Sequence, residues 1–313
     1  MSGLHHTLTM AFGVSGIVKE KGYFKTIDGT KMIRKTKDPM EQILAKRQIS
    51  EHCITKGYPW MDRYYLAKNG QISVFAEGDQ YIMTDLIRHK EADFTDDCEF
   101  LKVVGAAASW HSCAREISFA VPLQPGKSSV PLNETFRVQI ESLEAINKRI
   151  RKQSKWTDFD VCTIKNYPEY SSRMQRALKL LESTGYIKRW NEAKAKNHIC
   201  HGGFKEEVLN IRGGDVYITK LDSATVDYQL NDLCSLIRRR EKKKKGDLKR
   251  GRILEAYMQI SPLEPEEEVI LEAMLLYPFA FVKLVTEYYH KKRTWTPVAM
   301  TNKMKEILTL DFA

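Results

Sequence analysis

The alternation of apolar and polar positions divides the chain into a strand-rich beginning and a helix-rich remainder. Over the first 90 residues, short apolar runs are separated by turn signals such as Asp28-Gly29 and Lys68-Asn69-Gly70. Glycine supplies the positive φ angle that tight hairpin turns need. One helix interrupts the strands, because Pro39 opens a stretch, residues 40–55, in which apolar side chains recur near helical spacing. The pattern therefore predicts a small lobe of three strands, one helix and three more strands.

Beyond residue 87 the pattern becomes helical. Apolar residues recur at helical spacing at 100–113, 135–152, 168–184, 187–196, 230–243, 248–259, 266–276, 280–292 and 296–308. One pair of strands, 207–212 and 216–221, lies in the middle of these helices around a glycine turn. This is the element order of the kinase-like fold, in which nucleotide lies between the lobes and the strand pair carries the catalytic residues.

We therefore predict an α+β, two-lobed protein-kinase-like fold. The small β-rich N-lobe spans residues 1–87, and the larger, mainly helical C-lobe spans residues 88–313. A catalytic-loop-like insert at 197–222 lies within the C-lobe.

Composition excludes several classes of protein. Hydrophobic residues make up 42% and charged residues 29% of the 313 positions, which is typical of globular proteins. The six cysteines are scattered without a CxxC pair, so neither a disulfide framework nor a zinc ribbon is expected. No stretch reaches the roughly 18 uninterrupted apolar residues of a membrane span, and residues 1–10 do not read as a signal peptide. We expect neither a secreted nor an integral membrane protein.

The net charge of +10 favours acidic partners. Basic residues are densest in one run, which consists of Arg238, Arg239, Arg240, Lys242, Lys243, Lys244 and Lys245. Two interpretations stay open for this run: a solvated helix end, or a docking site for an acidic protein. Interleaved aromatic residues and a reader motif are both missing, so specific nucleic-acid binding is not expected.

Several segments resemble the CotS-type bacterial spore coat proteins, which are related to aminoglycoside phosphotransferases and choline kinases. The resemblance rests on the run 80–93, Trp110-His111, the run 197–211, the run 226–233, and the C-terminal Tyr277-Pro278-Phe279, Glu287-Tyr288-Tyr289 and Trp295. It implies a structural protein of the spore coat. Such a protein would assemble in the mother cell cytoplasm during sporulation, with other coat proteins, including acidic ones, as partners.

The same comparison indicates that the groups needed for phosphoryl transfer have been lost. The relatives' loop reads His-Gly-Asp, then four residues, then Asn, whereas this chain reads His201-Gly202-Gly203 and then has Val208. Gly203 has no side chain to orient an acceptor hydroxyl, and Val208 cannot bind a hard cation.

The same resemblance also matches residues of this chain to the relatives' metal-binding and phosphate-binding positions. Lys220 takes the place of the metal-binding aspartate, and Asp222 keeps the second acid of that motif. Arg34 takes the place of the phosphate-binding lysine, which arginine can replace only with a different reach and geometry. A register shift that brings Asn210 into the metal position is an alternative. His201 is expected to pack in the core, rather than to bind metal with His198 and Cys200.

We predict a catalytically inactive kinase-like (pseudokinase) scaffold with no cofactor. The alternative is an ATP-dependent phosphotransferase that acts on a sugar or other small hydroxylated molecule, with ATP and magnesium as cofactors. Arg34 and Asp222 would then be remnants of its site. A third possibility is a polyanion-binding protein that uses residues 238–245.

Overall fold

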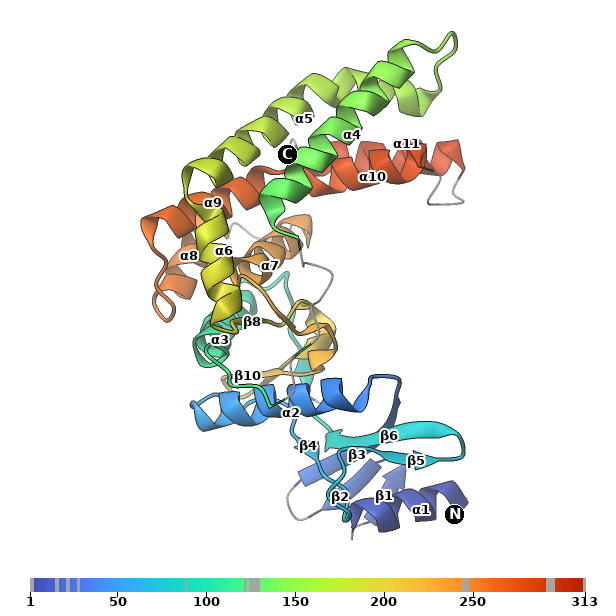
Figure 1. Ribbon diagram of the computed structural model, residues 1–313, viewed down its shortest axis with the longest axis vertical. Coiled ribbons are helices and arrows are strands. Elements are labelled where there is room, and N and C mark those ends of the chain that lie inside the picture. Colours follow the sequence, from blue (N-terminus) through green and yellow to red (C-terminus); the bar gives the residue numbers. More distant parts are fainter. Residues whose placement is uncertain are drawn as a thin grey trace. The chain divides into compact units, whose positions relative to one another are not determined.

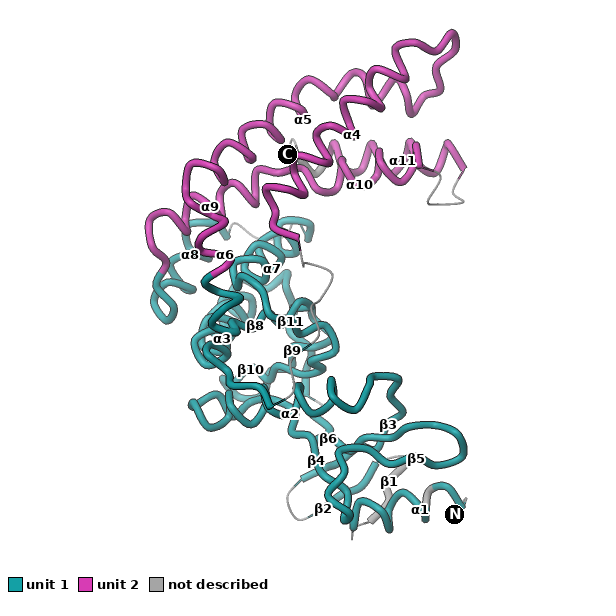
Figure 2. Tube along the Cα trace, viewed as in Figure 1, with its two compact units in different colours: residues 1–126, 192–262 teal, residues 127–191, 263–313 magenta. Residues whose placement is uncertain are grey.

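The computed structural model describes residues 3–14, 17–20, 23–26, 29–87, 89–120, 123, 130–243, 248–290 and 296–311. Two compact units are present: residues 1–126 with 192–262, and residues 127–191 with 263–313 (Figure 2). All strands that the structure describes lie in the first unit, and the described part of the second unit is built from helices (Figure 1 and Figure 2). The boundaries of these units do not coincide with the predicted lobe boundary at residue 87. The division into an N-lobe and a C-lobe at that residue stays a prediction.

The first unit begins with a six-stranded antiparallel sheet. Its strands are β1 (Ile17–Glu20), β2 (Tyr23–Thr26), β3 (Gly29–Thr36), β4 (Tyr64–Tyr65), β5 (Val74–Ala76) and β6 (Asp79–Asp85). The order is β1-β2-β3-β6-β4, and β5 also pairs with β6. Gly29 opens β3 with a φ of 108°, which fits the predicted turn before it, although Asp28 lies outside the described residues. The predicted strand-rich start of the chain is confirmed, and the predicted helix between the third and fourth strands is present, but a second helix precedes the strands.

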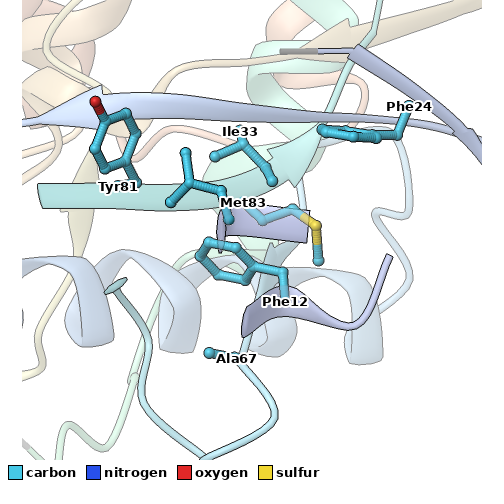
Figure 3. Close-up of a cluster of buried hydrophobic side chains, with 7 residues drawn as sticks. Phe12, Phe24, Ile33, Ala67, Tyr81 and Met83 are labelled. Atoms are coloured by element: carbon cyan, nitrogen blue, oxygen red, sulfur yellow. The ribbon is translucent and has the colours of Figure 1, made fainter. Parts of the chain in front are cut away.

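A helix that the sequence pattern did not reveal, α1 (Gly3–Phe12), packs on this sheet. Figure 3 shows Phe12 from this helix beside Ile33 and Met83 of the sheet. The helix α2 (Met40–Thr55) matches the predicted stretch and contacts β4 and α3. Its buried side chains include Ile43, Ser50 and Cys53, which share one face of the helix. Lys46 is also buried and lies on the same face.

The rest of the first unit surrounds the predicted strand pair. Its elements are β7 (Lys90–Glu91), α3 (Asp97–Cys113), β8 (Ile199–Cys200), η1 (Glu206–Val208), β9 (Leu209–Arg212), β10 (Asp215–Ile218), η2 (Leu221–Ser223), β11 (Thr225–Val226), α7 (Leu230–Lys243) and α8 (Arg250–Met258). The predicted pair is β9 and β10, and β7 extends it to a three-stranded sheet of order β10-β9-β7. The strand β9 begins at Leu209, two residues after the predicted start at residue 207, because residues 206–208 form a 3₁₀ turn.

The second unit contains α4 (Leu132–Arg151), α5 (Asp158–Ser183), α9 (Pro265–Leu276), α10 (Phe279–Tyr289) and α11 (Pro297–Asp311). Helix α6 (Tyr186–Ala195) runs from this unit into the first. Stacked aromatic pairs tie the helices together, with ring centroids 3.6 Å apart for Phe136 and Tyr277 and 3.9 Å apart for Tyr170 and Phe281. Among the described helices, none alone is long and apolar enough to cross a membrane. Only α9 and α10 taken together, bent by 41° at their break, reach that length and apolar character.

Candidate functional site

The loop that follows β8 is fixed by one buried carboxylate. The backbone N–H groups of His201 and Gly202 donate to the two oxygens of Asp232, at 2.6 and 2.9 Å. Asp232 lies in the first turn of α7 and also contacts Nε2 of His111, at 3.2 Å. A carboxylate with several hydrogen-bond donors is well stabilised in a buried place. The loop therefore has a defined backbone geometry, independent of any bound molecule.

His201 packs in the interior, as the sequence predicted. Its ring stacks on Phe204 with centroids 4.6 Å apart, and its Nε2–H donates to the carbonyl of Thr219 at 3.1 Å. Burial lowers the pKa of His201, which favours the neutral ring. Within the described part of the chain, no group of three or more His, Cys, Asp or Glu residues is arranged to hold a metal ion.

The two glycines of the loop differ in what they allow. Gly202 has a φ of +69°, and a Cβ atom there would lie 2.3 Å from the carbonyl oxygen of Ser223, so only glycine fits. A Cβ atom at Gly203 would make only ordinary contacts, of which the nearest is 3.5 Å to Oγ of Ser223. The backbone thus has room for a side chain at the predicted catalytic position, and the sequence supplies none.

The predicted asparagine position is filled by an apolar side chain. Val208 is buried, and its carbonyl oxygen accepts from the backbone N–H and the hydroxyl of Thr219, at 2.9 and 3.1 Å. Asn210 lies opposite Tyr217 in the β9–β10 ladder, and its Oδ1 accepts from the backbone N–H of His89 at 3.4 Å. The Asn210 side chain is thus engaged by the segment before β7.

Lys220 occupies a strained backbone conformation. Its φ of 59° and ψ of 73° lie in the left-handed region, which costs a residue with a Cβ atom roughly 1 kcal/mol or more. Its backbone N–H donates to Oδ2 of Asp62 at 3.1 Å, and its exposed ammonium reaches the carbonyl oxygen of Glu207 at 3.4 Å. Burial raises the pKa of Asp62 to about 7, despite the hydrogen bond from Lys220.

Two cations converge on Asp222, which the sequence predicted as a remnant of the site. Oδ1 of Asp222 lies 3.6 Å from the guanidinium of Arg34 and 3.3 Å from the ammonium of Lys46. Lys46 also binds Asp38 at 2.7 Å. Burial alone would raise the pKa of Asp38, but the hydrogen bond and the charge of Lys46 bring it below its ordinary value. The structure thus brings together Arg34 and Asp222, the pair expected from the sequence.

Lys46, Asp38 and Asp62 were not recognised from the sequence. For Lys46 the sequence holds a signal, because its spacing places it on the same helical face as Ile43 and Cys53. The structure confirms that only 6% of its side chain is exposed. A charged residue on a buried helical face needs a partner. No local pattern of this kind marked Asp38 or Asp62.

The basic run is only partly available to a partner. Arg240 is buried and forms an ion pair with Asp97, and Lys243 binds Glu206 at 2.8 Å. Arg240 therefore connects α7 to α3, so its predicted place in a docking surface is corrected. Arg239, Lys242 and Lys243 are exposed and Arg238 is half-buried, whereas Lys244 and Lys245 lie outside the described residues.

The sheet with its helix, the loop bonded to α7 and the β9–β10 pair define a kinase-like fold, as predicted. An aminoglycoside phosphotransferase from Alicyclobacillus acidocaldarius subsp. acidocaldarius DSM 446 is similar with a TM-score of 0.78 at 13% identity, over 98% of this chain and 91% of that one. An AMP-bound complex of spectinomycin phosphotransferase APH(9)-Ia is similar with a TM-score of 0.60 at 13% identity, over 99% and 97%. Amicoumacin kinase hAmiN, in complex with AMP-PNP, Ca2+ and Ami, gives a TM-score of 0.59 at 9% identity, over 98% and 92%.

At these identities the structural likeness establishes the fold alone. The family is established by sequence: the chain belongs to the family described as "Spore coat putative kinase YutH", whose family model matches residues 15–311. The resemblance to CotS-type spore coat proteins is thereby confirmed. No curated protein sequence matches this chain.

Proposed function

We propose that this protein is a catalytically inactive, kinase-like scaffolding protein of the bacterial spore coat. One observation carries the proposal: Asp222, the acid that remains at the predicted metal site, is engaged by the guanidinium of Arg34 and the ammonium of Lys46. A phosphotransferase of this fold uses acids and an asparagine there to hold magnesium ions. In this chain the carboxylate of Asp222 lies within ion-pair distance of two cationic side chains.

The side chains at this place fit a magnesium ion poorly. Magnesium requires oxygen ligands in near-octahedral geometry, and it is usually bound through carboxylates. Val208 offers no side-chain oxygen, and the ammonium of Lys220 would repel the ion. The proposal therefore includes no cofactor. The proposal also includes no phosphoryl transfer to an acceptor, because Gly203 supplies no acid to orient the attacking hydroxyl.

Membership of the spore coat family supports the proposed location and partners. The chain would be made in the mother cell cytoplasm during sporulation and then become part of the spore coat. Its partners would be other coat proteins. The net charge of +10 supports acidic surfaces among them.

Magnesium-dependent nucleotide binding tests the proposal. Thermal unfolding is followed with ATP or GTP, in magnesium and in EDTA, for the natural chain and for the variant Val208→Asn/Lys220→Asp, which restores both metal ligands. Ligand at 100 times its dissociation constant adds about 2.7 kcal/mol to stability. We expect no magnesium-dependent shift for the natural chain and a gain for the variant. A magnesium-dependent shift in the natural chain would contradict the proposal and favour an ATP-dependent phosphotransferase acting on a sugar or other small hydroxylated molecule.

A further inference from the structure

The loop between α4 and α5 combines an exposed tryptophan with a dense group of cations. Residues 148–158 contain five basic residues, all exposed: Lys148, Arg149, Arg151, Lys152 and Lys155. Asp158 is the one acidic residue in this range. Residues 151–158 are exposed without interruption, at the end of the helical pair in Figure 1. We call residues 148–158 the α4–α5 tip.

Trp156 is held in place although it is 45% exposed. Its indole N–H donates to the carbonyl oxygen of Ile150, in the last turn of α4, at 3.0 Å. The indole donor is thus already satisfied, and a partner can cover the ring without leaving an unpaired polar group. A fixed aromatic side chain also loses little conformational entropy on binding, as in the centres of protein interfaces.

The cations of the tip are paired to different degrees. Lys148 binds Glu144 at 2.6 Å, and the guanidinium of Arg149 lies 5.0 Å from the ring centroid of Tyr289. Lys152 and Lys155 form no ion pair with any residue that the structure describes. Their charges therefore remain available, in contrast to Arg240 and Lys243 of the basic run on α7.

We infer that the α4–α5 tip is a docking site for an acidic protein segment that also carries an apolar side chain. The charge of the tip favours a negative partner, and the fixed ring of Trp156 offers one apolar contact in the same segment. A membrane surface fits less well, because interfacial helices bury a broad apolar face. Single-stranded nucleic acid fits less well too, because it uses successive aromatic platforms. This site goes beyond the proposed function and does not depend on whether the chain binds nucleotide.

The test uses the full chain and a labelled peptide of repeated Glu-Glu-Leu, with fluorescence anisotropy as the readout. Lys152→Glu/Lys155→Glu is expected to weaken binding by about tenfold or more, because each reversed charge now faces a like charge. The matched control is Arg176→Glu/Lys179→Glu, which changes the net charge equally on exposed positions of α5. The control is expected to weaken binding by no more than about threefold. Equal weakening by both pairs, or no measurable binding of the peptide, would overturn the inference.

The role of the tryptophan is tested separately. Trp156→Ala is expected to weaken binding by about tenfold, and Trp156→Phe by much less, because it keeps an apolar ring. A peptide of repeated Glu-Glu-Ser should bind about tenfold more weakly than the leucine peptide, and it should be insensitive to Trp156→Ala. Tighter, tip-dependent binding to vesicles of phosphatidylcholine and phosphatidylglycerol, or to single-stranded RNA, would overturn the assignment to a protein partner.

Discussion

Two adjacent glycines differ in whether the backbone requires them. Gly202 is required, because its φ is +69° and a Cβ atom would clash with the carbonyl oxygen of Ser223 at 2.3 Å. Gly203 is not required, because a Cβ atom there would lie 3.5 Å or more from its neighbours. The backbone at position 203 would therefore accept a Cβ atom, so the absence of a side chain there is not imposed by the fold.

At this scale, alanine at the two positions should have unequal effects. Gly202→Ala is expected to lower the free energy of unfolding by about 2 kcal/mol or more, from backbone strain and overpacking. Gly203→Ala should change the free energy of unfolding by less than about 1 kcal/mol. Urea denaturation of both variants measures the difference. Equal destabilisation would mean that the loop does not have the backbone geometry described here.

Residue patterns revealed part of the candidate site. The pair Arg34 and Asp222 could be anticipated, because a family resemblance assigns positions without needing distances. Lys46 was missed because a lysine in a helix usually extends into solvent, although its spacing puts it on the same helical face as Ile43 and Cys53. Asp62 was missed because its partner, the backbone N–H of Lys220, lies far away in sequence.

Among the elements, α7 shows how a charge run can be divided between structure and surface. Arg240 is buried against α3, where it pairs with Asp97 and lies 6.0 Å from the ring centroid of Phe100. Its neighbour Arg239 is exposed. A helix of this kind presents some of its cations inward, so a run of like charges in the sequence overstates the charge available to a partner.

The two arginines therefore make a matched pair of variants. Arg240→Ala is expected to lower the free energy of unfolding by about 2 kcal/mol, because it removes a buried ion pair and its packing. Arg239→Ala should stay within about 0.5 kcal/mol of the natural chain. Both values come from chemical denaturation at the same salt concentration. Equal stability of the two variants would contradict the structural role of Arg240.

Secondary structure followed from the sequence where local signals were strong. The hairpin predicted before Gly29 is present, because β2 pairs with β3, and α2 follows Pro39 as predicted. The hairpin predicted around Gly70 was wrong, because β4 and β5 each pair with β6 instead of with each other. The start of α5 was predicted ten residues late, at Pro168, whereas the helix begins at a capping box formed by Thr157 and Asp160. The helix α1 was missed because its apolar residues, such as Leu8 and Phe12, pack against the sheet, and this contact cannot be recognised from the local sequence.

At the scale of the whole molecule, the chain has the fold of aminoglycoside phosphotransferase-like kinases, and we propose that it differs from them at the positions that carry their chemistry. The fold rests on distributed packing, such as the aromatic pairs and the bonds to Asp232, and these contacts do not use the side chains at positions 203, 208 and 220. Fold and activity can therefore separate in evolution, because one fold supports many functions. The proposed scaffold uses its surfaces, and the α4–α5 tip is the surface we assign to a partner.

The most direct test of the central claim is ATP turnover by the purified full chain. ADP formation is measured in magnesium, with and without amino sugars as acceptors, beside the variant Asp222→Asn. We predict that the natural chain forms ADP no faster than the variant or buffer, because Gly203 has no acid to orient an acceptor and Val208 has no oxygen to bind magnesium. Saturable, magnesium-dependent ADP formation that Asp222→Asn abolishes would contradict the account and identify a working phosphotransferase.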